Sequence, residues 1–123
     1  MKSRILIVDD NADLRRLYAI GLNQRGYEVR LAANGAEALD RMEQDPVDLI
    51  ILDVQMPVLD GWGFIDRLSA TQSQPIPILI LSGYPPPSDK EIPGSVIGWV
   101  NKPATIDDVC SKLVGFDVAS AAS

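Results

Sequence analysis

Two stretches of the sequence, ILIVDD at residues 5–10 and LIILD at residues 49–53, decide the fold that it predicts. Each begins with four consecutive large apolar side chains, the pattern of a strand buried on both faces of a parallel sheet. Each then ends in aspartate. Because parallel strands end at the same edge of a sheet, Asp9, Asp10 and Asp53 are expected to converge in one crevice.

Two further apolar runs bring different chemistry to the same edge. ILIL at residues 78–81 leads into Ser82, and VIGWV at residues 96–100 ends two residues before Lys102. Like charges held close together are costly, so three carboxylates at one place imply a bound cation, and oxygen-only ligands favour Mg²⁺. The single lysine suggests an anion beside the metal.

Helical patterns alternate with these strands. Capping residues mark where the helices begin, and a glycine or a polar stretch marks where they end. The expected starts are Asn11, Asn34 with Glu37, Asp60 or Gly61, and Thr105 with Asp108, and the first and last helices end at Gly26 and Gly115. The apolar positions at helical spacing are Leu14, Leu17, Tyr18, Gly21 and Leu22, then Ala38, Leu39 and Met42, then Trp62, Phe64, Ile65 and Leu68, and finally Ile106, Val109, Cys110, Leu113 and Val114.

The order of strands and helices predicts an α/β fold with a doubly wound, five-stranded parallel sheet of order 2-1-3-4-5, which is flavodoxin-like. Residues 27–32 alternate apolar side chains with Glu28 and Arg30, as expected of an edge strand. In this order the chain reverses direction between the first and third strands. The ligand crevice is therefore predicted outside their carboxyl ends, where the three aspartates lie.

The segment that would form the fourth helix reads YPPPSDKEIPG, residues 84–94. Each proline inside a helix removes a hydrogen bond and costs about 3 kcal/mol, more than the roughly 1 kcal/mol that a cap at Ser88 would return. We expect this helix to be shortened or replaced by a proline-rich loop. With this helix shortened or lost, we expect a monomer or a weak dimer through another face.

Length and composition restrict the function. The chain has 123 residues, enough for one domain, here placed at residues 3–116 with a tail or linker start at 117–123. Its net charge of −6 argues against direct binding to nucleic acid or to an anionic membrane. The lone Cys110 and the lack of an export signal or long apolar segment favour a cytoplasmic location.

Four motifs in register carry a resemblance to a known family. They are VDD at 8–10, DVQMPVLDG at 53–61, Ser82 with its small neighbour, and the dipeptide at 102–103. Over about residues 3–116 the chain resembles a two-component response-regulator receiver domain of the CheY-like superfamily. The resemblance implies a phosphorylation-dependent switch that is not a conventional enzyme, although it catalyses its own phosphorylation and dephosphorylation.

The resemblance also implies a role for each site residue. Asp53 would be the phosphoacceptor, and Ser82 and Lys102 would contact the phosphoryl oxygens. Mg²⁺ would be bound by Asp10, Asp53 and the main-chain carbonyl of Gln55, with Asp9 helping through water or by orienting Asp10. Because side chains alternate along a strand, we also expect only one of the two adjacent aspartates to aim into the crevice, and Asp10 to matter more for the metal.

Three residues depart from the family pattern in ways that bear on switching. Gln55 and Tyr84 occupy the positions that flank the path of hydrolytic water, so Tyr84 is expected to hinder that water. Trp99 replaces the tyrosine or phenylalanine that is usual at the rotameric switch position.

The chain contains no histidine, so the phosphohistidine donor must come from elsewhere. This donor would be a histidine kinase or a phosphotransfer protein.

Alternatives to this reading come from other functional classes. A degenerate receiver would act as a phosphorylation-independent interaction module, and the domain could also belong to a hybrid histidine kinase. A Mg²⁺-dependent phosphatase with an aspartyl-phosphate intermediate would need an acid two residues after its nucleophile, where Gln55 stands instead. The output partner, or a fused output domain, is not identified by any residue in the sequence.

Overall fold

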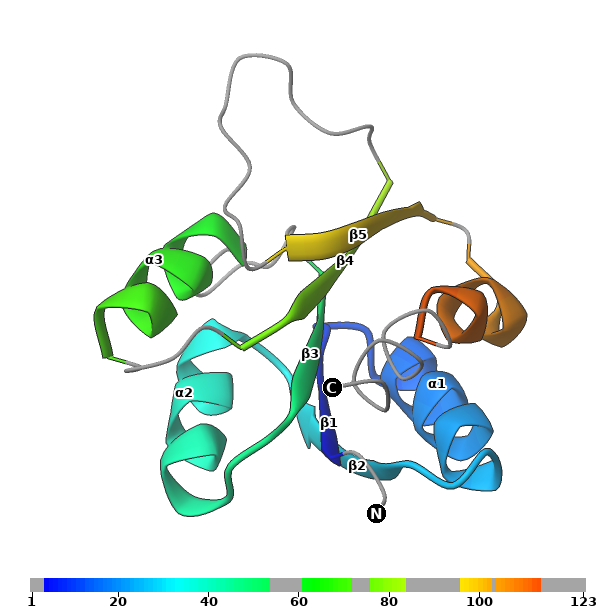
Figure 1. The fold of residues 1–123 in the computed structure, drawn as a ribbon, viewed down its shortest axis with the longest axis horizontal. Coiled ribbons are helices and arrows are strands. Elements are labelled where there is room, and N and C mark those ends of the chain that lie inside the picture. The colour runs from blue at the N-terminus through cyan, green and yellow to red at the C-terminus, as the bar shows by residue number, and fades with distance from the viewer. Residues whose placement is uncertain (1–3, 54–60, 72–75, 84–95, 103, 114–123) are drawn as a thin grey trace, which may run out of the picture.

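A computed structural model of the protein describes residues 4–53, 61–71, 76–83, 96–102 and 104–113. The labelled strands and helices follow one another along the described part of the chain (Figure 1). They are β1 (Arg4–Val8), α1 (Ala12–Gln24), β2 (Glu28–Ala32), α2 (Gly35–Gln44), β3 (Leu49–Asp53), α3 (Gly61–Thr71), β4 (Ile78–Ser82) and β5 (Val96–Asn101). A further helical segment covers residues 106–113.

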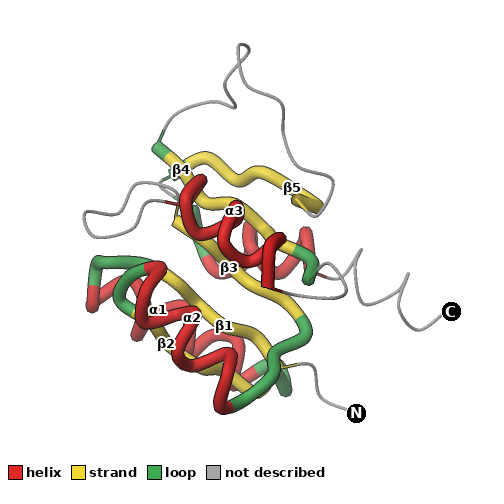
Figure 2. Tube along the Cα trace, turned by 90° about the vertical axis from the view of Figure 1, so that its left-hand side faces the viewer, coloured by secondary structure: helices red, strands yellow, loops and turns green. Residues whose placement is uncertain are grey.

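The five strands form one parallel sheet in the order β2-β1-β3-β4-β5. This confirms the predicted fold class and strand order, with the half-polar strand β2 at one edge. Helices α2 and α3 cover one face of the sheet, and α1 and the 106–113 segment cover the other (Figure 1). Figure 2, seen from the side of α2 and α3, shows the strands side by side behind these helices.

The core lies in two layers, one on each face of the sheet. Alternate residues of one strand enter opposite layers: in β1, Leu6 packs with Phe64 and its neighbours, whereas Ile7 packs with Tyr18 and its neighbours. Both faces of β1, β3 and β4 are therefore buried, which explains their continuous apolar runs. Each fully buried side chain of this size contributes roughly 1.5–3 kcal/mol to folding.

The predicted helix caps are present. The side chain of Asn11 accepts hydrogen bonds from the main-chain N–H groups of Asp13 and Leu14, at 3.0 and 3.2 Å. Asn34 accepts one from Glu37 at 2.9 Å. The first helix ends as expected before Gly26, whose φ of 94° lies in the region that favours glycine.

Helix 106–113 begins with the predicted reciprocal cap. The main-chain N–H of Thr105 donates to Asp108 at 3.0 Å, and the N–H of Asp108 donates to the Thr105 hydroxyl oxygen at 3.1 Å. In α3, three of the four predicted core residues, Phe64, Ile65 and Leu68, are buried.

One expectation about α1 was wrong. Leu17 was placed on the apolar face of this helix, but 55% of it is exposed. The buried residues of the helix are Tyr18, Gly21 and Leu22. A stripe through these positions faces the sheet, and Leu17 lies on the solvent side of it because each residue turns the helix by about 100°.

Several predictions fall outside the described residues. These concern the proline-rich segment 84–94, the segment that contains Gln55, and the tail at 117–123. Of the helices that the structure describes, none combines the length and apolar character needed to cross a membrane.

Candidate functional site

The polar residues predicted at the strand ends come together at one edge of the sheet. Asp53 and Ser82 are the last residues of β3 and β4, whereas Asp9 and Lys102 directly follow β1 and β5. The strands are parallel, so their carboxyl ends meet at the same edge of the sheet.

Three carboxylates form the acidic part of the site. Asp9, Asp10 and Asp53 each place one oxygen within 4.8 Å of the others. Asp9 and Asp53 are buried, with 1% and 3% of each residue exposed, and Asp10 is exposed. Buried acids this close together, with only oxygen donors, suit a hard divalent cation such as Mg²⁺.

The expectation that only one of the adjacent aspartates could aim into the crevice was wrong. Oxygens of both Asp9 and Asp10 lie within the same 4.8 Å cluster. The strand β1 ends at Val8, and Asp10 lies in a bend. The alternation of side chains along a strand therefore no longer applies at these two positions.

Lys102 supplies the positive charge. Its Nζ lies 3.1 Å from Oδ2 of Asp53 and 3.3 Å from Oδ2 of Asp9, so it joins the two buried acids. Its main-chain N–H donates to the carbonyl oxygen of Ser82 at 2.7 Å, which ties the end of β5 to the end of β4. Ser82 is itself buried beside this contact.

Hydrogen bonds also hold the chain at Asp9. Its Oδ1 accepts the main-chain N–H of Asn11 at 2.9 Å, and its own N–H donates to the carbonyl oxygen of Ala32 at 3.1 Å. The guanidinium of Arg15 donates to the main-chain oxygen of Asp9 at 2.6 Å. These contacts fix one buried acid from both the sheet and α1.

The site environment shifts two pKa values upward. Burial raises the pKa of Asp9 above its ordinary 3.8, and this outweighs the opposing effects of the Asn11 N–H and of Lys102. For Lys102, burial alone would lower the pKa, but the carboxylates of Asp9 and Asp53 together raise it. Lys102 therefore stays an ammonium at neutral pH.

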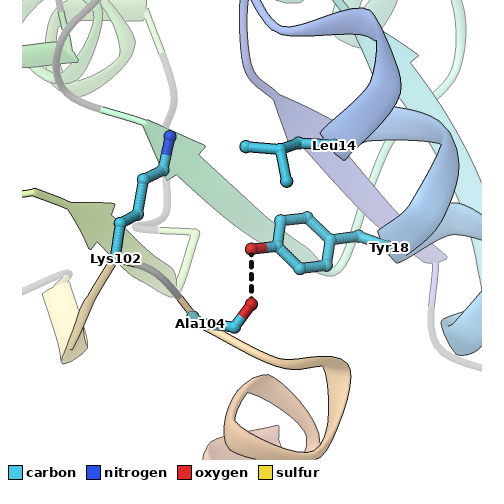
Figure 3. Close-up of a pocket in the computed structure, with 4 residues that line it drawn as sticks. All are labelled: Leu14, Tyr18, Lys102 and Ala104. Atoms are coloured by element: carbon cyan, nitrogen blue, oxygen red, sulfur yellow. Dashed lines mark hydrogen bonds between the residues drawn. The ribbon is translucent and has the colours of Figure 1, made fainter.

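A pocket of about 340 Å³ opens next to the lysine. Leu14 and Tyr18 of α1 line one side, and Lys102 and Ala104 line the other (Figure 3). The Tyr18 hydroxyl donates to the main-chain oxygen of Ala104 at 3.0 Å. The lysine stem thus borders open space on the side that faces α1.

Of the remaining predicted residues, the structure describes Trp99 but not the other two. Trp99, three residues before Lys102, is partly buried against the core layer on the side of α2 and α3. Gln55 and Tyr84 lie outside the described residues.

Comparison with known proteins decides the family. The family model for the response regulator receiver domain matches residues 5–113. The chain belongs to the response regulator receiver domain family. A probable transcriptional regulator, ycf27, of Cyanophora paradoxa is 39% identical over 115 residues, which is 91% of this chain and 47% of that protein. This receiver domain therefore spans about half the length of the curated relatives that it matches.

Solved receiver structures share the fold. A chemotaxis protein of Vibrio cholerae, CheY4, matches with a TM-score of 0.81 and 32% identity, covering 92% of this chain and 97% of that one. The response regulator TrrA of Thermotoga maritima, solved in complex with Mg²⁺-BeF, matches with a TM-score of 0.76 and 31% identity, covering 94% and 98%.

Sequence reasoning missed two residues that shape the site from α1. Arg15 holds the main chain at Asp9, and Tyr18 holds the main chain at Ala104. In the sequence, Arg15 looks like a solvated helix arginine and Tyr18 like an ordinary core residue. The nearness of Arg15 to the aspartate pair was a weak signal, and Tyr18 offered none.

Proposed function

We propose that this receiver domain accepts a phosphoryl group onto Asp53 from a phosphohistidine donor in a Mg²⁺-dependent reaction, and that the modification switches its interactions with partners. The observation that carries the proposal is the position of Lys102. Its ammonium lies between Asp53 and Asp9, whose carboxylate oxygens belong to one cluster with an oxygen of Asp10. A nucleophile, a metal-binding acid pair and a cation are the parts that phosphoryl transfer needs.

In the proposed reaction a carboxylate oxygen of Asp53 attacks the phosphorus in line with the donor nitrogen. The new O–P bond gives an acyl phosphate, the P–N bond breaks, and the imidazole leaves with its electron pair and takes up a proton from water. Lys102 would exchange its contact with Asp53 for one with a phosphoryl oxygen, and Ser82 would donate a hydrogen bond to another.

Asp10, Asp53 and the main-chain carbonyl of Gln55 would hold Mg²⁺, which when bound neutralises charge on the phosphoryl oxygens. Asp9 would assist through water or by orienting Asp10. The formal charges support a requirement for the metal. Two carboxylates, an acyl phosphate of about −2, Lys102 and Mg²⁺ sum to about −1, against about −3 without the metal.

The partners follow from the chemistry. No histidine is present in the 123 residues, so the phosphohistidine belongs to a histidine kinase or a phosphotransfer protein. We assign the receiver unit to residues 3–116, place it in the cytoplasm as a monomer or weak dimer, and leave its output to a partner or a fused domain. Trp99 would take part in switching, and Gln55 and Tyr84 would modulate loss of the phosphoryl group.

The test is uptake of the phosphoryl analogue BeF₃⁻. With Mg²⁺ present, it should bind and change the tryptophan fluorescence, and removal of Mg²⁺ by EDTA should abolish the change. Asp53→Asn should not respond. Asp40→Asn, an exposed carboxylate of α2, is the matched control and should respond like the wild type. A response that survives in Asp53→Asn would reject Asp53 as the acceptor, and no response in the wild type would favour a degenerate interaction module.

A further inference from the structure

Tyr18 connects helix α1 to the chain just beyond Lys102. Its side chain is almost fully buried, and its hydroxyl donates to the main-chain oxygen of Ala104, 86 positions away in the sequence. The ring packs in the core layer between α1 and the 106–113 segment. The hydroxyl, however, reaches the border of the pocket next to the functional site (Figure 3).

The position of Lys102 is not fixed by packing alone. Its stem borders the 340 Å³ pocket that it shares with Leu14, Tyr18 and Ala104, so the side chain has space to turn toward α1. A lysine side chain has several rotatable bonds and loses much rotamer entropy when it is held in one place. Its main chain must therefore be well placed if Nζ is to stay beside both buried acids.

Two hydrogen bonds hold the main chain around this lysine. On one side, the N–H of Lys102 donates to the carbonyl oxygen of Ser82 at 2.7 Å. On the other, the carbonyl oxygen of Ala104 accepts the Tyr18 hydroxyl at 3.0 Å. The first contact ties Lys102 to the sheet, and the second ties the following segment to α1.

Close packing further along α1 supports the same connection. A Cβ atom added at Gly21 would lie 2.4 Å from Cγ1 of Ile106, so the helix and the 106–113 segment approach closely there. Arg25 pairs with Asp107 at 2.7 Å, but both side chains are well exposed, so this pair contributes little. Of these contacts, the Tyr18 hydrogen bond is the nearest in sequence to Lys102.

We propose that Tyr18 is a positioning residue for Lys102: its hydroxyl holds Ala104 so that the lysine ammonium stays between Asp9 and Asp53 instead of turning into the pocket. The role in phosphoryl transfer rests on the proposed function, whereas the effect on the lysine does not. An ammonium beside the acids competes with a metal but stabilises an incoming phosphoryl group. Loss of the hydroxyl should therefore strengthen metal binding and slow phosphorylation.

The experiment compares Tyr18→Phe, which removes only the hydroxyl, with wild type, with Lys102→Met and with the double variant. Tyr27→Phe is the matched control, because this tyrosine packs against the same core layer directly before β2. Tyr18→Phe should tighten Mg²⁺ binding roughly three-fold, because the ammonium moves a few ångströms from the metal site. It should slow phosphorylation by acetyl phosphate roughly ten-fold, as misplaced catalytic groups do.

If the effect of Tyr18→Phe depends on Lys102, Tyr18 positions the lysine and does not merely stabilise the site in general. Adding Tyr18→Phe to Lys102→Met should change neither the Mg²⁺ affinity nor the phosphorylation rate. The proposal is overturned if Tyr18→Phe weakens Mg²⁺ binding or leaves it unchanged. It is also overturned if the effect of Tyr18→Phe is the same with and without the lysine. If the wild type takes up no phosphoryl group, the proposed function fails, but the Mg²⁺ titrations still decide whether Tyr18 positions Lys102.

Discussion

The ammonium nitrogen of Lys102 lies 3.1 Å from Oδ2 of Asp53, although 49 positions separate the two residues in the sequence. The contact joins the end of β5 to the end of β3 across the intervening strand β4. Without a phosphoryl group, the lysine neutralises the acid that would act as nucleophile. The same geometry places its charge where phosphoryl oxygens would arrive.

Metal binding should depend more on Asp10 than on Asp9. Both oxygens of Asp9 already have partners, the Asn11 N–H and Lys102, whereas Asp10 is exposed at the mouth of the cluster. Asp10→Asn should weaken Mg²⁺ binding about ten-fold or more, as loss of a direct ligand would, and Asp9→Asn should weaken it less. Calorimetric titration of each variant measures this. Equal affinities in wild type and Asp10→Asn would rule out a metal role for Asp10.

The stability of the metal-free protein should depend on the charge of Asp9. Its pKa is higher in the folded state than the ordinary 3.8, so folding favours the protonated acid. The stabilisation is complete below pH 3.8 and is lost as the pH rises through the folded pKa. Asp9→Asn should therefore raise the free energy of unfolding at neutral pH, measured by urea denaturation in EDTA. A variant that is less stable than the wild type at pH 7 would contradict this.

Much of this fold was predictable because burial leaves a local signal. Strands covered on both faces need continuous apolar runs, and β1, β3 and β4 have them. The caps at Asn11 and Asn34 were also predictable, because a side-chain oxygen there satisfies N–H groups two or three residues on.

The acidic site could be predicted from the residues that end the apolar runs, but the contacts that hold the main chain around it could not. Whether Arg15 reaches the main chain at Asp9, or Tyr18 the main chain at Ala104, depends on how α1 is placed over the sheet. Such contacts join distant residues and impose no periodicity on the sequence. The exposure of Leu17 has the same origin, because the helix can rotate about its axis without changing its apolar spacing.

Helix α1 should not tolerate a larger residue at Gly21. A Cβ there would lie 2.4 Å from Cγ1 of Ile106, which is too close for two carbon atoms. Because Cγ1 lies near the start of the isoleucine side chain, it cannot move away easily. Overpacking costs about 1–3 kcal/mol and the gain in helix propensity is about 1 kcal/mol, so Gly21→Ala should be destabilising on balance. Ile106→Ala should partly rescue it in a double-mutant cycle. Strictly additive effects would show that the two residues do not clash.

The thiol of Cys110 should be inert in the folded protein. It is buried, and burial raises its pKa above the ordinary value, which leaves less thiolate at neutral pH. Reaction with a disulfide reagent at pH 7 should be slow in buffer and become fast in urea. Rapid labelling of the native protein would contradict the packing of the 106–113 segment against α1.

The lifetime of the phosphoryl group should depend on Tyr84. This prediction rests on the resemblance to receiver domains, in which the position two residues after the hydroxyl residue flanks the path of hydrolytic water; here that position holds the bulky Tyr84. Tyr84→Ala should speed loss of phosphate from the phosphorylated protein, followed by mass spectrometry over time. Tyr84→Phe should behave like the wild type because it keeps the bulk. Unchanged or slower loss in Tyr84→Ala would end the shielding argument.

Whether Asp53 accepts a phosphoryl group can be measured by intact-mass analysis after incubation with acetyl phosphate and Mg²⁺. The wild type and the Asp40→Asn control should each gain the mass of one phosphoryl group, and peptide mapping should place it on Asp53. Asp53→Asn should gain none. An Asp53→Asn protein that is phosphorylated at the wild-type rate would show that Asp53 is not the phosphoacceptor.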